Sequence, residues 1–129
     1  MGMGVSTMKL VVKRDAFTAA LSAAATVSPL RGVRPNLKNA LLIADTDGSM
    51  EIQATDLEVG LRYKLKAESV SEPASICLPC AMLAGLLKEC TEDVVTLETD
   101  GAKGLLKAGR DRFEILGQES SEFPDVPDL

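Results

Sequence analysis

The stretch "QATDLEVGLR", residues 53–62, decides how the middle of this chain folds. It places two carboxylates, Asp56 and Glu58, close together beside a threonine, which is how a catalytic or metal-binding pair looks. Residues 50–55 and 59–65 alternate between apolar and polar, a pattern typical of antiparallel strands with one solvated face. Asp and Thr side chains in a short link between strands can bond backbone N–H groups and hold a tight turn. We therefore interpret "TDLE" as the link of a hairpin rather than as an active site.

The patterns along the whole chain, this hairpin included, predict an order of elements that occurs twice. The first half comprises a strand at 9–14, a helix at 15–27, and strands at 39–45, 50–55 and 59–65. The second half comprises a strand at 74–78, a helix at 79–90, and strands at 93–99, 105–108 and 112–116. Residues 68–73 are predicted to be a polar connection and 120–129 an extended exit from the domain. The fold class is therefore α+β, with two helices side by side on a two-part antiparallel sheet.

The first predicted helix, residues 15–27, has an unusual outer face. Asp15 is the expected N-cap residue, and the face opposite the apolar one carries small residues such as Thr18 and Ser22. A solvated helix normally carries Lys and Glu there. We therefore expect another molecule to come close to this face.

Composition excludes several classes of function. The chain has 129 residues, 46% of them hydrophobic, which is enough for one domain with a core. Its 14 basic and 19 acidic residues argue against a protein that grips nucleic acid with its whole surface. Histidine, the commonest general base and zinc ligand, is absent. No secretory signal or apolar run of roughly 18–20 residues occurs, which favours a cytoplasmic protein.

Three cysteines are an odd number and fit a reducing compartment. Cys77 and Cys80 form a C-x-x-C pair, which could be a redox pair or half of a zinc site. A zinc site needs four ligands, and only Cys90 remains. We interpret Cys77 as the end of a strand and Cys80 as the start of a helix, both as small buried hydrophobic residues.

Several short motifs, in this order and spacing, resemble the first domain of the bacterial DNA sliding clamp, the β subunit of the replicative DNA polymerase III. The matching segments are "MKLVV" (8–12), "NALLIA" (39–44), "ATDLEVGL" (54–61), "LP" (78–79), "GRDRFEI" (109–115) and "EFPDVPDL" (122–129). The resemblance implies that residues 8–129 are the first clamp domain. Residues 1–7 would then be an extension, a tag or the result of a wrongly chosen start codon, and the second and third domains would lie outside this chain.

The resemblance also implies an activity. Clamps of this family have the DNA-clamp (processivity) fold, and their subunits join head to tail in a ring that encircles duplex DNA. The helices line the hole and the sheets form the outer rim. The ring holds the polymerase on duplex DNA by topology rather than by tight binding, and its DNA contacts are nonspecific and to phosphates. The family has no catalytic activity, cofactor or metal. The polymerase and the clamp loader bind to the later domains, so those partners are not expected to dock here.

Basic residues that match DNA-contacting positions of the family define a candidate DNA-binding set. Arg31 lies in the loop after the first helix and Lys88 at the end of the second, both where the resemblance implies a basic residue facing the hole. Arg34 and Lys38 lie near Arg31 and match less closely. The alternative for each is an ordinary solvated surface charge.

Arg110, Arg112 and Phe113 match family residues at the joint between subunits, where the arginines pair with acidic residues on the third domain of the neighbouring chain. On a strand, positions i and i+2 put both guanidinium groups on one face, where each can take a carboxylate. The alternative is a charged edge strand that blocks aggregation. The sequence departs from the family early in the second helix, where Ala81 and Met82 stand in place of a basic residue.

Two other functions compete with that of a clamp domain. One is a small enzyme that uses Asp56 and Glu58 with a divalent metal, although two carboxylates alone make a thin metal site. The other is a general α+β interaction module that pairs with peptides through its strand edge and has no role on DNA. The sequence leaves the oligomeric state open, since a single domain can close a ring only if several copies join.

Overall fold

The computed structural model describes residues 7–27, 39–56 and 59–119 of the chain. The elements in those ranges are β1 (Thr7–Lys13), α1 (Arg14–Val27), β2 (Asn39–Ala44), β3 (Ser49–Thr55), β4 (Gly60–Lys66), β5 (Ser69–Val70), β6 (Ala74–Pro79), α2 (Cys80–Glu89), β7 (Val94–Asp100), β8 (Lys103–Ala108), β9 (Asp111–Leu116) and β10 (Gln118–Glu119). The predicted succession of strand, helix and three strands, repeated once, is confirmed. Neither helix is long and apolar enough to cross a membrane, within the ranges described.

The ten strands form two five-stranded antiparallel sheets with equivalent strand orders, β5-β1-β7-β8-β9 and β10-β6-β2-β3-β4. The first strand of each half crosses into the sheet of the other half. β1 pairs with β7, with Leu10 opposite Leu97, and β6 pairs with β2, with Ile76 opposite Leu42. The short strands β5 and β10 extend these crossed strands at the sheet edges, so the two halves are interleaved rather than merely adjacent.

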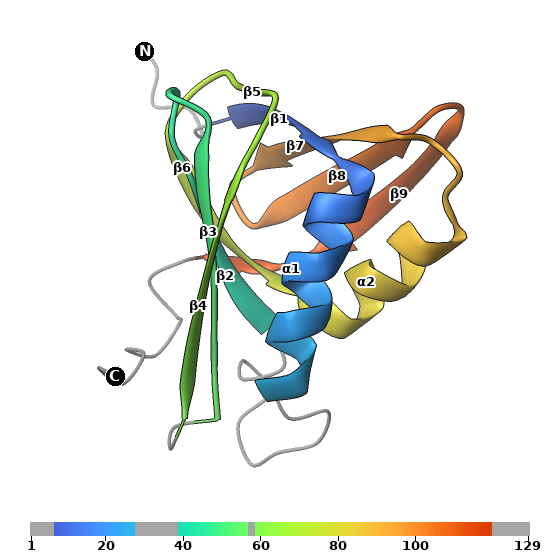
Figure 1. Ribbon diagram of the computed structural model, residues 1–129. Coiled ribbons are helices and arrows are strands. Elements are labelled where there is room, and N and C mark those ends of the chain that lie inside the picture. The colour runs from blue at the N-terminus through green and yellow to red at the C-terminus, as the bar shows by residue number, and fades with distance from the viewer. Residues whose placement is uncertain (1–6, 28–38, 57–58, 120–129) are drawn as a thin grey trace.

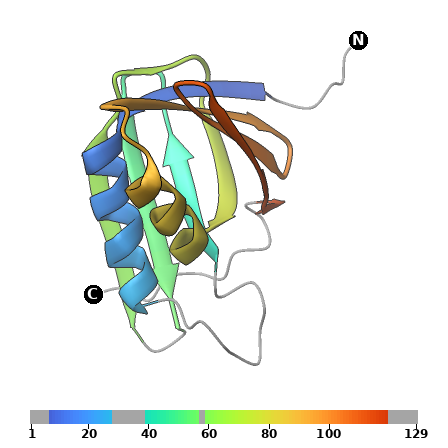
Figure 2. The ribbon, with the colours of Figure 1, turned by 90° about the vertical axis from the view of Figure 1, so that its right-hand side faces the viewer.

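Both helices lie side by side on one side of the two sheets (Figures 1 and 2). The core fills the space between the helices and the sheets. It is almost entirely aliphatic, as the shortage of aromatic residues predicts. Its largest fully buried side chains are Phe17, Met8, Leu10, Leu21, Leu42, Ile52, Ile76, Leu78, Leu83, Leu87, Leu97 and Leu106. Because apolar residues recur in α1 at Phe17, Ala20, Leu21 and Ala24, one helical face is buried and the opposite face is left outward.

The structure corrects two details of the sequence prediction. Asp15 is not the N-cap of α1, because the helix already begins at Arg14 and Asp15 lies in its first turn, paired with the Arg14 guanidinium at 3.0 Å. The short strands β5 and β10 were not predicted, β5 lying inside the stretch expected to be a polar connection. A two-residue strand has no periodicity to detect, and it exists only because a neighbouring edge offers it backbone hydrogen bonds.

Candidate functional site

Thr55 and Asp56 hold the turn between β3 and β4 through hydrogen bonds with Val59. The Thr55 hydroxyl donates to the Val59 carbonyl oxygen at 2.8 Å, and the Val59 N–H donates to Asp56 Oδ1 at 2.8 Å. No group of three side chains able to hold a metal ion occurs among the described residues. The interpretation of Thr55 and Asp56 as turn-forming residues is confirmed, whereas Glu58 lies outside the described residues.

The three cysteines are packing residues. Cys77 lies in β6, Cys80 is the first residue of α2 and Cys90 follows the helix, and all three are buried and form no disulfide. Burial raises the pKa of the Cys90 thiol above its ordinary value, and the nearby Asp111 carboxylate adds to this effect. The Cys90 thiol donates to the Leu86 carbonyl oxygen at 3.3 Å. The expectation that Cys77 and Cys80 are small buried hydrophobic residues is therefore confirmed.

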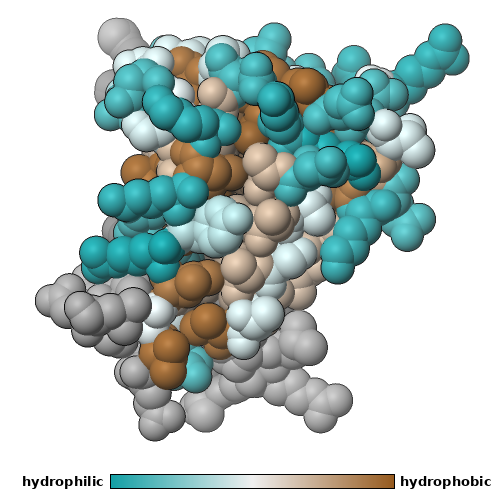
Figure 3. All heavy atoms as spheres, in the orientation of Figure 1, coloured by the Kyte–Doolittle hydropathy of each residue, from teal (hydrophilic) through white to brown (hydrophobic). Residues whose placement is uncertain are grey.

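The outward face of α1 is small and carries no charge beyond its first turn. Its residues outside the core include Thr18, Ala19, Ser22, Ala23 and Thr26. Two of its hydroxyls are satisfied inside the helix, because Thr18 donates to the Arg14 carbonyl oxygen at 2.7 Å and Thr26 to the Ala23 carbonyl oxygen at 2.6 Å. Figure 3 shows this face as a pale band flanked by strongly hydrophilic side chains. The unusual helix face predicted from the sequence is thus present.

Lys88 is the one member of the candidate DNA-binding set that falls within the described residues. It is exposed in the last turn of α2, where a cation also complements the partial negative charge of the helix C-terminus. Arg31, Arg34 and Lys38 lie outside the described residues. The DNA-contacting role of all four remains a prediction.

β9 is an edge strand, as the candidate subunit joint requires. Arg112 is exposed on its outer face, while Phe113, opposite Leu106, turns inward and packs against the core. Arg110 is not on the strand but in the two-residue turn that joins β8 to β9, where Gly109 has φ 61°. This corrects the expected i and i+2 pairing on one strand, because such a tight hairpin needs positive φ in its turn and β9 begins only at Asp111.

Ala81 and Met82, the positions at which the sequence departs from the family, are both exposed near the start of α2. Met82 is 49% exposed. The first turn of α2 itself therefore carries no positive charge that a joint could use.

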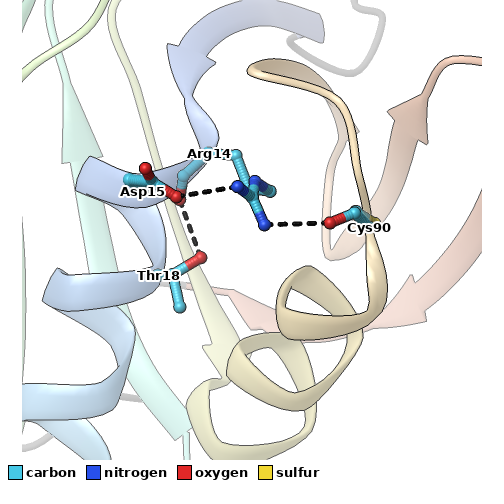
Figure 4. Close-up of polar contacts among 4 residues, drawn as sticks. All are labelled: Arg14, Asp15, Thr18 and Cys90. Atoms are coloured by element: carbon cyan, nitrogen blue, oxygen red, sulfur yellow. Dashed lines mark hydrogen bonds and ion pairs between the residues drawn. The ribbon is translucent and has the colours of Figure 1, made fainter.

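Arg14 links the two helices, a role that sequence reasoning missed (Figure 4). It begins α1, and its Nη1 donates at 2.9 Å to the carbonyl oxygen of Cys90, directly after α2. Its backbone N–H donates at 2.8 Å to the Asp93 carbonyl oxygen. The side chain is only 24% exposed, and its Nε has no partner among the described residues. An arginine between a strand and a helix looks like a surface residue in sequence, so only the distant carbonyl reveals its role.

A family model described as the DNA polymerase III beta subunit, N-terminal domain, matches residues 8–127. The beta sliding clamp of Pseudomonas putida is 32% identical over 120 residues, which are 92% of this chain and 32% of that protein. The beta sliding clamp of Synechococcus elongatus is 31% identical over 122 residues, 93% of this chain and 32% of that protein. The chain thus spans about one third of the length of these relatives.

Solved structures give the same result. A Pseudomonas aeruginosa sliding clamp bound to griselimycin has a TM-score of 0.87 at 30% identity, covering 96% of this chain and 34% of that chain. The C. crescentus beta sliding clamp has a TM-score of 0.88 at 27% identity, covering 95% of this chain and 33% of that chain. The general interaction module is therefore not favoured. With the fold, the edge strand and the family match in agreement, this chain belongs to the family of N-terminal domains of the bacterial DNA polymerase III beta subunit, the beta sliding clamp.

Proposed function

We propose that this domain forms one section of a ring that encircles duplex DNA and keeps the replicative DNA polymerase on its template. The observation that carries this proposal is the division of the domain into two sides, with α1 and α2 together on one and the sheets on the other. The helices would line the hole and the sheets the outer rim. The family to which the chain belongs supports the same arrangement.

The chemistry of the helix face suits sliding better than gripping. Each Lys–phosphate contact releases counterions and adds salt-dependent affinity, so a face rich in cations would hold DNA in place. The outward face of α1 offers small residues whose hydroxyls are bonded to their own helix. A few cations would keep the duplex centred without reading its sequence, namely Lys88 together with Arg31, Arg34 and Lys38.

We propose that β9 forms the head-to-tail joint with another subunit. Its outer backbone edge has no strand beside it among the described residues, which leaves N–H and C=O groups available for a neighbouring strand. Arg112 is exposed beside that edge, and Arg110 extends from the adjoining turn, so both can reach carboxylates of a partner. Phe113, which packs against the core on the inner face of β9, would hold the strand in place for the joint.

The remaining parts of the proposal follow from clamp action. The domain would work by topology without catalysis or a cofactor, in the cytoplasm where bacterial DNA lies. The polymerase and the clamp loader would bind to domains beyond this chain.

DNA contact can be tested by NMR titration of the chain with a short duplex. We expect weak, sequence-independent and salt-sensitive chemical-shift changes that are concentrated on α1 and α2. Lys88→Glu should weaken binding, because it reverses the charge facing the phosphates, whereas Lys64→Glu on the outer face of β4 should not. Shifts concentrated on the outer faces of the sheets, or equal effects of the two variants, would contradict the proposal.

The joint can be tested by light scattering over a range of chain concentrations. With a second copy of this chain supplying the partner surface, self-association through β9 should rise with concentration, and Arg112→Glu should shift the chain toward the monomer. The matched charge reversal Lys13→Glu, on the exposed end of β1, should leave the molar mass unchanged. Assembly that is insensitive to Arg112→Glu would count against this joint.

A further inference from the structure

A groove of about 480 Å³ lies on the outer face of the sheet β5-β1-β7-β8-β9, away from the core. Two rows of paired residues cross the strands there. The first row runs Lys9, Glu98, Leu105, Glu114 and the second Thr7, Asp100, Lys103, Leu116. Because residues opposite one another in antiparallel strands share a face, all eight side chains point outward together.

The groove combines an apolar centre with an acidic rim. Leu105 and Leu116 are diagonal neighbours on adjacent strands, close enough for their side chains to meet, and Leu116 is 76% exposed. The acidic residues that line the groove are Glu72, Glu98, Asp100 and Glu114, and the basic ones are Lys9 and Lys103. Glu98 is engaged with Lys107 at 2.9 Å, whereas Asp100 and Glu114 form no ion pair with any described residue.

The second half of the fold repeat provides a natural comparison. β2, β3 and β4 occupy the places that β7, β8 and β9 occupy in the first sheet, and the pair Ile52–Tyr63 corresponds to the pair Leu106–Phe113. A hollow of about 520 Å³ lies at the equivalent position. It is lined by Ile43, Asp45, Ser49, Met50, Glu51, Lys64, Leu65 and Lys66. The hollow itself is therefore a property of the fold.

The chemistry of the two hollows differs at equivalent positions. Where β9 carries Glu114 and Leu116, β4 carries Lys64 and Lys66. The groove beside β9 thus has an exposed leucine and an excess of acid. The hollow beside β4 has lysines at the same places and balanced charge, with two acids and two bases among its lining residues.

We propose that the groove beside β9 binds an extended, basic peptide segment of a partner protein, with an apolar side chain of the peptide seated on Leu105 and Leu116. Lys or Arg residues flanking that apolar residue would meet Asp100 and Glu114, which form no ion pair with any described residue. The rows of the groove are two residues apart along each strand, which matches the side-chain repeat of an extended peptide. This interaction surface is separate from the helix face and goes beyond the ring function.

An apolar centre enclosed by a polar rim is the arrangement in which a few contacts carry most of a peptide's affinity. The exposed rim acids would steer a basic segment toward the groove and reject an acidic one. The hollow beside β4 has lysines in place of Glu114 and Leu116 and no excess of acid, which makes it the matched control within the same molecule.

The test uses the full chain and a short fluorescein-labelled peptide of alternating lysine and leucine, followed by anisotropy and by NMR. We expect saturable binding with shifts concentrated on β7, β8 and β9. The variant Glu114→Lys with Leu116→Lys, which gives β9 the residues of β4, should weaken binding at least about tenfold. The variant Asp45→Asn with Glu51→Gln, in the control hollow, should leave the affinity unchanged. A lysine–serine peptide should bind more weakly, and a glutamate–leucine peptide should not bind.

The groove variants are not expected to unfold, because Glu114 and Leu116 are exposed. The equivalent positions of β4 in the other sheet already carry lysine. Retained NMR dispersion checks this, and the single changes Glu114→Gln and Leu116→Ser give the same comparison if the double variant unfolds. Equal losses for the groove and control variants would overturn the proposal, because the peptide would then follow overall charge. Absence of peptide binding would also overturn the proposal. So would a loss of self-association of the chain in the variant Leu116→Lys, because the groove would then be occupied by a second copy of the chain.

Discussion

At the scale of single residues, Gly117 has no room for a side chain. A Cβ at this position, between β9 and β10, would overlap the Cys77 carbonyl oxygen, and the Gly117 N–H already donates to the Ala102 carbonyl oxygen at 2.8 Å. Gly117→Ala should therefore destabilise the domain by about 2 kcal/mol or more, measured by urea unfolding. Gly85→Ala is the matched control, because a Cβ there meets nothing within 4 Å. It should stabilise α2 by about 0.5–1 kcal/mol.

Asp56 should matter to stability through its hydrogen bond and not through its charge. Asp56→Ala removes the acceptor of the Val59 N–H and should cost about 1 kcal/mol in the free energy of unfolding. Asp56→Asn keeps an acceptor oxygen and should stay close to the unmodified chain. If the neutral asparagine is as costly as alanine, the negative charge itself would be required, and the turn-forming role would be wrong.

At the scale of elements, Arg14 connects the start of α1 to the end of α2. Arg14→Met keeps the aliphatic packing but leaves the Cys90 carbonyl oxygen without this donor, so we expect a loss of about 1–2 kcal/mol in urea unfolding. Lys13→Met, one residue earlier on an exposed site, is the control and should change stability little. Equal losses in the two variants would mean that the helix link contributes nothing specific.

The elements themselves follow from local patterns to different degrees. The α1 helix and the β3–β4 hairpin are predictable because their apolar residues repeat with the period of the element. β5 and β10 are not, since each is two residues long and depends on an edge supplied by a distant strand. The position of Arg110 was not predictable from local spacing either. Its spacing from Arg112 suggests that both lie on one strand, but the tight turn at Gly109 places Arg110 before β9 begins.

At the scale of the whole molecule, the exchange of β1 and β6 between the halves should make unfolding a single cooperative event. Tyr63 fluorescence reports on β4 in one sheet, and far-UV circular dichroism reports on both sheets. We expect the two signals to give one coincident urea transition. Fragments 1–72 and 73–129 should each lack folded structure and regain it on mixing, because each half alone misses a central strand. Two separate transitions, or a folded half, would contradict this interleaving.

The element order, the turn chemistry of Thr55 and Asp56 and the family resemblance could all be read from the sequence. These features depend on residues near one another in the chain, where spacing and side-chain type are enough. Strand order, the Arg14 link and the groove around Leu105 and Leu116 could not be read in this way. They arise from pairings between distant segments, such as Lys9 opposite Glu98, and the free energy of burying two sheets and two helices in one core decides those pairings.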